Sequence, residues 1–153
     1  MPVRAPPRRL LPPVYLVLAL GALAALHLLA PGHRLLDPPW TLVGLVPAAL
    51  GVAISLAGVR GFRRAGTPAT PFQMPEHLVT TGVYGFTRNP MYLGLVLVLV
   101  GVALLLGSLT PWAVVPAFAL LLDRRFVRAE EAMLAIRFES AWTAYRGRVR
   151  RWL

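Results

Sequence analysis

A short run of polar, aromatic and turn-forming residues lies directly before an uncharged stretch of the chain, and it holds the residue types best suited to bind a small charged molecule. Arg88 carries a permanent planar cation that can grip a carboxylate or a phosphate through parallel hydrogen bonds. Tyr84, Phe86 and Tyr92 place rings around it that can stack on a heterocycle or face a cation. One interpretation is therefore an anion site with aromatic walls. The other is an interfacial anchor, because Arg and Tyr at the mouth of a membrane helix often only hold it at the headgroups.

Pro90 predicts where the next helix begins. Its ring fixes φ, it has no N–H, and it disfavours the helical conformation at the preceding residue. We therefore expect a helix that starts near Pro90 or Met91, with Asn89 at the N-cap position.

Adjacent carboxylates, Glu130 and Glu131, form a second candidate cluster near the C-terminus. On their own they are typical of a solvated helical face that pairs with neighbouring arginines such as Arg128. Only a link to the first cluster would give them a role in binding.

These two segments resemble the signature of the integral-membrane methyltransferases of the isoprenylcysteine carboxyl methyltransferase and phospholipid methyltransferase group. The first block is Gly82-x-Tyr84-x-x-x-Arg88-Asn89-Pro90-x-Tyr92-x-Gly94. The second is Glu130-Glu131-x-x-Leu134-x-x-x-Phe138, followed by Trp142, Tyr145, Val149, Arg151 and Trp152. Two blocks at the family's internal spacing are far more specific than one.

The resemblance implies that the cofactor is S-adenosylmethionine. It implies that Arg88 holds the methionine carboxylate and acts with Asn89 in catalysis, and that Glu130 and Glu131 take ribose hydroxyls or the amino group. The remaining cofactor residues implied by the family pattern are His77, Leu78, Gly82, Tyr84, Pro90 and Tyr92, and the substrate residues are Trp142 and Tyr145. The charges agree with this assignment, since one cation and two anions complement a ligand that bears a carboxylate, an ammonium and a sulfonium.

The sequence also departs from the family pattern. Asn89 stands where the prenylcysteine enzymes usually carry His, Glu139 replaces a common Gly after Phe138, and Trp142 replaces a common Tyr. The acceptor is thus left open between a prenylcysteine carboxylate, an amino-phospholipid and another small hydrophobic molecule. The first departure favours the broader bacterial and phospholipid-type branch, in a bacterial or archaeal cell membrane.

The composition is that of a membrane protein. The 153 residues allow one domain, and 57% are hydrophobic, with a mean hydropathy of +0.64. The net charge of +10 does not indicate a nucleic-acid partner, because the basic residues lie between and after the apolar runs. The chain has no cysteine and no lysine, which excludes disulfides, thiolate metal sites and Schiff-base chemistry, and no metal site is expected.

We predict an all-α membrane protein with about four transmembrane helices, over residues 14–30, 40–59, 91–106 and 111–122, the last two forming a tight hairpin at Gly107 to Pro111. The uncharged run 91–122 is too long for one span and must fold back. Pro47 and Pro116 should kink their helices. A signal peptide is the alternative for the first run. Gly44, Gly51 and Gly58 recur every seventh residue, which favours one packing face.

The remaining segments predict the working side of the protein. Residues 1–13 read as an irregular lead-in, residues 66–75 as an ordered loop over the bundle, and residues 123–146 as an amphipathic cytosolic helix whose apolar face holds Leu134, Phe138, Ala141, Trp142 and Tyr145. Of the 16 Arg, only Arg34 falls in a far-side loop, so both termini should be cytoplasmic. The pocket is expected from residues 60–90 and 123–153.

Three functions therefore compete. The leading one is S-adenosylmethionine-dependent methyl transfer to a lipophilic acceptor that enters from the bilayer, with the bilayer as partner. The sequence does not determine the oligomeric state. The second is an NADPH-dependent membrane reductase of related architecture. The third is a non-catalytic four-helix protein or transporter, although proton-coupled transporters need an acid within the membrane and all six acids lie outside the apolar runs.

Overall fold

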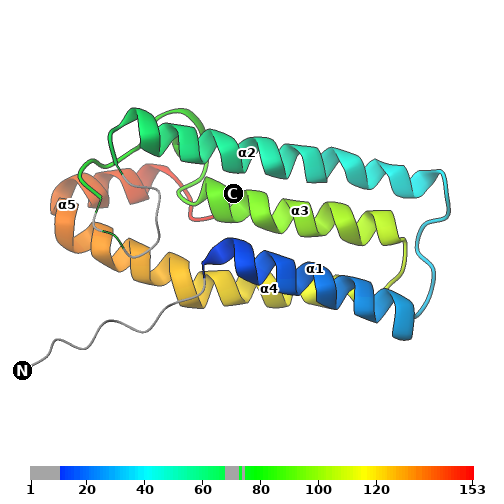
Figure 1. The fold of residues 1–153 in the computed structure, drawn as a ribbon. Coiled ribbons are helices and arrows are strands. Elements are labelled where there is room, and N and C mark those ends of the chain that lie inside the picture. Colours follow the sequence, from blue (N-terminus) through cyan, green and yellow to red (C-terminus); the bar gives the residue numbers. More distant parts are fainter. Residues whose placement is uncertain (1–10, 68–72, 74) are drawn as a thin grey trace, which may run out of the picture.

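The computed structural model describes residues 11–67, 73 and 75–153. Within this part the chain is helical, as predicted, and four long helical stretches run side by side in an antiparallel bundle (Figure 1). Most of the lead-in (residues 1–10) and most of the loop predicted over the bundle (residues 68–72 and 74) lie outside the described residues.

Helix α1 (Pro12–Leu29) and helix α2 (Leu45–Arg64), which a 3₁₀ turn η1 (Trp40–Gly44) precedes, are long and apolar enough to cross a membrane. Both also expose many large apolar side chains, such as Val17 and Leu18 on α1, which a bundle in water would bury. Helix α2 extends five residues beyond the predicted end at 59, and its last turns therefore carry the basic residues that were predicted to follow it.

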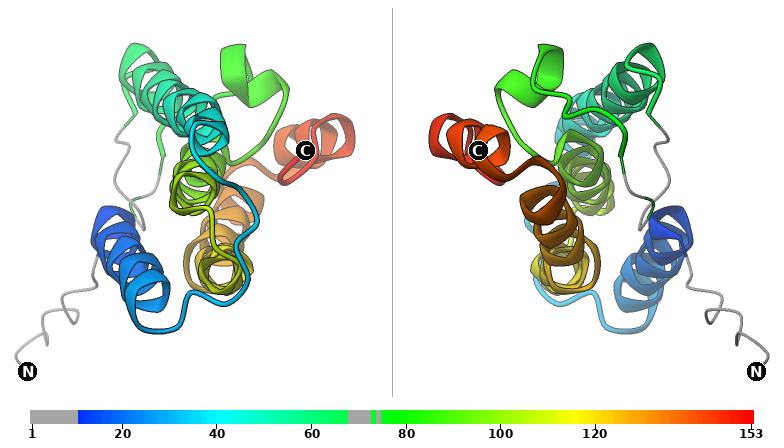
Figure 2. Two further views of the ribbon diagram at one scale, coloured as in Figure 1. Left: turned by 90° about the vertical axis from the view of Figure 1, so that its right-hand side faces the viewer. Right: turned by 90° about the vertical axis from the view of Figure 1, so that its left-hand side faces the viewer.

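Helix α3 (Pro90–Leu106) starts at the predicted proline and lies in the middle of the bundle, in contact with α1, α2 and α4 (Figure 2). At 17 residues it measures about 25 Å. Gly107 ends it with a left-handed φ of 69°, a conformation that glycine adopts at little cost. The predicted hairpin turn is therefore present, and it continues into the 3₁₀ turn η3 (Thr110–Ala113).

The return arm is not the separate short helix that was predicted over residues 111–122. Helix α4 (Val114–Leu122) passes through a π-helical turn η4 (Asp123–Val127) directly into helix α5 (Arg128–Arg148), with helical backbone angles at the junctions. The charges that begin at Asp123 mark a change of surroundings and not the end of a helix. Pro47 and Pro116 fall where a 3₁₀ turn passes into α2 and α4, so their missing N–H groups lie in a first turn.

Helix α5 is broken at Glu139, where φ is 38° and ψ is −106°. The break shifts the helical phase, which explains why Trp142 and Tyr145 are buried as expected whereas Ala141 is exposed. After the break the chain turns back toward the start of α3 (Figure 1). The C-terminal residues therefore lie beside the segment that carries Arg88.

The core has two parts. One is an apolar cluster between α1, α3 and α4, centred on the fully buried Leu23, Leu99 and Leu122. The other is a close contact of α2 with α3, in which a Cβ atom added at Gly51 would lie 2.4 Å from the carbonyl oxygen of Gly94.

The bundle end away from the C-terminus is closed by hydrogen bonds between its two connections. Leu35 donates to the carbonyl of Gly107 at 2.8 Å, and Leu109 donates to that of His33 at 3.0 Å. His27, predicted to be a polar residue and not a ligand, bonds Ser108 Oγ at 2.7 Å through Nδ1. The chemistry-bearing residues are gathered at the opposite end.

Candidate active site

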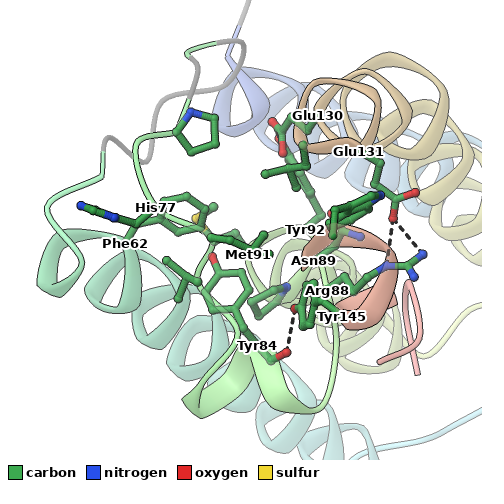
Figure 3. Close-up of a pocket in the computed structure, with 16 residues that line it drawn as sticks. Phe62, His77, Tyr84, Arg88, Asn89, Met91, Tyr92, Glu130, Glu131 and Tyr145 are labelled. Atoms are coloured by element: carbon green, nitrogen blue, oxygen red, sulfur yellow. Dashed lines mark hydrogen bonds and ion pairs between the residues drawn. The ribbon is translucent and has the colours of Figure 1, made fainter. Parts of the chain in front are cut away.

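One cavity lies at the end of the bundle where α2 ends, α3 begins and α5 folds back (Figure 3). It holds about 520 Å³ of space, its open mouth included. Segments far apart in the sequence supply its walls, and the lining residues are Phe62, Pro75, His77, Leu78, Val79, Tyr84, Arg88, Asn89, Pro90, Met91, Tyr92, Glu130, Glu131, Leu134, Trp142 and Tyr145.

Tyr84 connects three of the elements that build the cavity. It lies in the 3₁₀ turn η2 (Gly82–Gly85), is buried, and donates to the carbonyl of Gly58 on α2 at 3.4 Å. Its own carbonyl accepts a 2.7 Å hydrogen bond from the hydroxyl of Tyr145 on α5. Burial raises the pKa of the Tyr84 hydroxyl, so this group stays protonated and acts as a donor.

Asn89 precedes the first residue of α3 as predicted, but its side chain does not cap the helix. The side-chain amide instead donates to the carbonyl of Arg151 at 3.1 Å, and the Thr87 hydroxyl donates to the same carbonyl at 3.1 Å. The Arg88 N–H bonds the carbonyl of Arg150 at 3.0 Å. The C-terminal tail, residues 149–153, is thereby held against the start of α3.

The guanidinium of Arg88 grips a carboxylate, and this carboxylate belongs to the protein. Its Nη2 lies 3.0 Å from Oε1 of Glu131, and its Nε donates to the same oxygen at 3.2 Å. Nη1 donates to the carbonyls of Arg146 at 3.0 Å and Val149 at 3.2 Å. Both charged side chains are little exposed, at 12% for Arg88 and 13% for Glu131, so the pair is shielded from water.

Arg151 extends the ion pair into a network. Its Nη2 lies 2.6 Å from Oε2 of Glu131, and its Nη1 lies 3.3 Å from Oδ1 of Asp123. The hydrogen bond to Glu131 is the main reason that the pKa of Arg151 is raised. Asp123 also pairs with Arg128 at 2.8 Å. The network joins η4, α5 and the tail, and it neutralises the cations next to the cavity.

Glu130 stands apart from the network. Its carboxylate accepts a hydrogen bond from the hydroxyl of Tyr92 on α3. Burial raises the pKa of Glu130 from its ordinary value of 4.5 to about 7, although the hydrogen bond from Tyr92 acts in the opposite direction. A carboxyl group with this pKa can both hold and release a proton near neutral pH.

Two aromatic residues of α5 complete the cavity. The Arg88 guanidinium carbon lies 5.4 Å from the centre of the Trp142 ring, a cation–π contact, and the Trp142 and Tyr145 rings meet edge to face at 5.8 Å. Burial raises the pKa of Tyr145 to about 12. Phe86, expected beside Arg88, instead lies outside the cavity with 82% of its surface exposed.

The structure brings together the predicted site residues with two exceptions, Phe86 and Gly82. The predicted residues around the cavity are His77, Leu78, Tyr84, Arg88, Asn89, Pro90, Tyr92, Glu130, Glu131, Trp142 and Tyr145, whereas Gly82 lines a separate groove. Sequence reasoning missed the roles of Phe62, Pro75, Val79, Met91 and Leu134 as walls. Leu134 belongs to the second motif block and could have been found there, but apolar wall residues otherwise give no chemical signal.

The apolar bundle, with a charged and aromatic cavity at one end, defines a membrane protein with a candidate small-molecule site. The model of the phospholipid methyltransferase family matches residues 40–141, more than half of the chain, and the chain belongs to this family. It is thus a methyltransferase of a family that acts on lipophilic substrates. No curated protein and no solved structure matches the chain.

Proposed function

We propose that the protein transfers a methyl group from S-adenosylmethionine to a lipophilic acceptor at the cytoplasmic face of a membrane. The observation that carries this proposal is the convergence of residues 84–92 with α5 on one cavity, in a chain of the phospholipid methyltransferase family. The acceptor is a prenylcysteine carboxylate, an amino-phospholipid or another small hydrophobic molecule that enters from the bilayer.

The donor set of the cavity suits the methionine part of the cofactor. That part carries an ammonium and a carboxylate on the same carbon atom, and Arg88 and Glu131 present the complementary charges 3.0 Å apart. The ion pair can open to accept this part of the cofactor, so that Arg88 binds the carboxylate and Glu131 binds the ammonium. Each side chain then keeps another partner: Arg88 still donates to the backbone carbonyls of Arg146 and Val149, and Glu131 still pairs with Arg151. Asn89 holds the tail that supplies these second partners.

The other walls suit the rest of the cofactor. The rings of Tyr84, Trp142 and Tyr145 can stack on a purine and attract a positive sulfur. When bound, S-adenosylmethionine supplies a methyl group activated by its sulfonium. The protein's own task is to hold the acceptor in line and to keep water out, and apolar walls such as Met91 and Leu134 serve that purpose.

Glu130 is the residue of this site that can move a proton. An ammonium acceptor must lose a proton before its nitrogen can attack, and Glu130, with a pKa of about 7, can receive this proton at Oε when it is in its carboxylate form. A carboxylate acceptor needs no base. Loss of Glu130 should therefore slow methyl transfer to amines more than transfer to carboxylates.

Calorimetry of the purified full-length protein with S-adenosylhomocysteine tests the proposal. Glu130→Gln keeps the shape of the side chain and should weaken binding about tenfold, because the family resemblance assigns the Glu130 carboxylate to the ribose hydroxyls or the amino group of the cofactor. Glu139→Gln removes an exposed carboxylate of the same helix and is the matched control. Arg88→Ala is less suitable, because Arg88 also holds the tail.

Binding by the wild type, weakened in Glu130→Gln and unchanged in Glu139→Gln, is the expected pattern. Equal affinity in all three proteins would reject the role of Glu130. Binding of NADPH without binding of S-adenosylhomocysteine would replace the proposal with the reductase function.

A further inference from the structure

A second hollow lies beside the cavity, between the last turns of α2 and the segment 78–83. It is an open groove with about 1200 Å³ of space, the open side included. It is lined by Ala57, Arg60, Gly61, Arg64, Ala65, Leu78, Val79, Thr80, Thr81, Gly82 and Val83. Leu78 and Val79 also line the cavity, so this short segment is the wall that the two hollows share.

The groove carries positive charge that the protein does not neutralise. All six acidic residues of the sequence fall within the described residues, and none of them forms an ion pair with Arg60 or Arg64. The situation at the cavity is the opposite, since Arg88 and Arg151 both pair with Glu131 there. Arg60 and Arg64 are therefore not paired with a carboxylate of the protein, unlike the arginines at the cavity.

The positions of the two arginines suit one anion held between them. Residues four apart on a helix lie on the same face, and like charges at this spacing repel each other. An anion between Arg60 and Arg64 would remove that repulsion and receive a planar fork of donors from each. Thr80 and Thr81, whose side chains carry hydroxyl groups, line the same groove. A phosphate group carries several acceptor oxygens on one phosphorus atom, and these can accept hydrogen bonds from both guanidinium groups at once.

We propose that the groove formed by Arg60, Arg64, Thr80 and Thr81 is a binding site for a phosphate group. The phosphate can belong to a lipid headgroup or be free in solution. The groove lies at the end of α2, a helix long enough to cross a membrane, where lipid phosphates are concentrated. The proposal does not depend on methyl transfer, because no cofactor contact enters it.

Arg63 offers a matched control. It lies in the same last turns of α2 and is exposed like Arg60 and Arg64, but it does not line the groove. If the arginines at this end of α2 only lay at the membrane surface, replacing Arg63 would weaken phosphate binding as much as replacing Arg60 or Arg64. If the groove is a specific binding site, only the replacement of an arginine that lines it should weaken binding.

The test is calorimetry of the full-length protein in a maltoside detergent, with dihexanoyl phosphatidic acid as one probe and inorganic phosphate as the other. The lipid probe should bind the wild type, and Arg60→Gln and Arg64→Gln should each weaken this binding about tenfold. Arg63→Gln should leave it unchanged. Binding of the lipid probe alone identifies a headgroup site, and equal binding of both probes identifies a site for free phosphate.

Failure of both probes to bind the wild type would overturn the proposal, and so would an equal loss in Arg63→Gln. Binding of S-adenosylhomocysteine should be unchanged in all three arginine variants. This second titration shows that the variants are folded, and it separates a failure of the phosphate site from a failure of the methyltransferase assignment.

Discussion

Glu139 adopts backbone angles that glycine tolerates and other residues adopt only with strain. Its φ of 38° and ψ of −106° interrupt α5 and let the rest of the helix turn back over the cavity. Related proteins commonly carry Gly at this position, as the resemblance of the second motif block implies. Glu139 is thus both a residue at which the sequence departs from the family pattern and the residue with the unusual backbone angles.

We expect Glu139→Gly to stabilise the protein by about 1 kcal/mol, because it removes the cost of positive φ at a side-chain-bearing residue. Thermal unfolding in detergent, followed by circular dichroism, measures the change. Ser140→Gly is the control, since the next residue has helical angles and glycine there should destabilise by about 1 kcal/mol. Equal losses in both variants would show that the break at Glu139 carries no strain.

Glu130 should make the stability depend on pH. The pKa of its carboxyl group is raised in the folded protein to about 7, from an ordinary value of 4.5. The folded state then binds this proton more tightly than the unfolded state does. The contribution to stability is fully present below the ordinary pKa and is lost as the pH rises through the folded value.

The melting temperature of the wild type relative to Glu130→Gln should therefore fall between about pH 5 and about pH 8. Glutamine cannot titrate, yet it can still accept the hydrogen bond from Tyr92. Melting curves of both proteins over this range provide the measurement, and the difference between them cancels the other titrating groups. Parallel curves would mean that Glu130 keeps an ordinary pKa.

At the scale of elements, the contact of α2 with α3 depends on glycine. The predicted packing face of Gly44, Gly51 and Gly58 is confirmed, because a Cβ atom at any of these positions would come within 3 Å of atoms on α3. At Gly51 the nearest atom is a backbone oxygen, which no side-chain rotation can move away. The helices must separate to admit even one methyl group.

Gly51→Ala should therefore destabilise the protein by about 1 to 3 kcal/mol through overpacking. Gly21 is the matched control, since it also lies within a helix and a Cβ atom there meets nothing within 4 Å. Gly21→Ala should be neutral or stabilising by up to about 1 kcal/mol. Thermal unfolding of the two variants tests this, and an unchanged melting temperature in Gly51→Ala would contradict the close contact.

The extent to which sequence predicts this fold follows from the range of the interactions. Apolar runs, Pro90 and Gly107 act locally, so the helices, the start of α3 and the hairpin were predictable. The partner of Arg88 was not, because the choice of Glu131 depends on how the tail and α5 fold back. Likewise, the sequence did not reveal that α4 continues into α5. The change from apolar to charged residues shows where the helix leaves the apolar surroundings, but it does not show whether the helical backbone ends there.

At the scale of the whole molecule, charge is distributed unequally between the two ends of the bundle. The cavity, the groove and the ion network all lie at one end, together with the basic end of α2. The connection at the other end holds Arg34, which pairs with Asp37 at 2.8 Å. Because arginines are retained on the cytoplasmic side during insertion, this asymmetry predicts that the cavity faces the cytoplasm.

The absence of cysteine from the natural chain allows a direct test of this orientation. His33→Cys places a thiol in the exposed connection after α1, and Ser140→Cys places one on the exposed surface of α5. A membrane-impermeant maleimide should label His33→Cys from outside intact cells and Ser140→Cys only in inverted vesicles. Leu23→Cys, at a fully buried position, should react in neither preparation and controls for leakage through the bundle. Labelling of Ser140→Cys from outside would invert the topology, and a site on that face would have no access to a cofactor made in the cytoplasm.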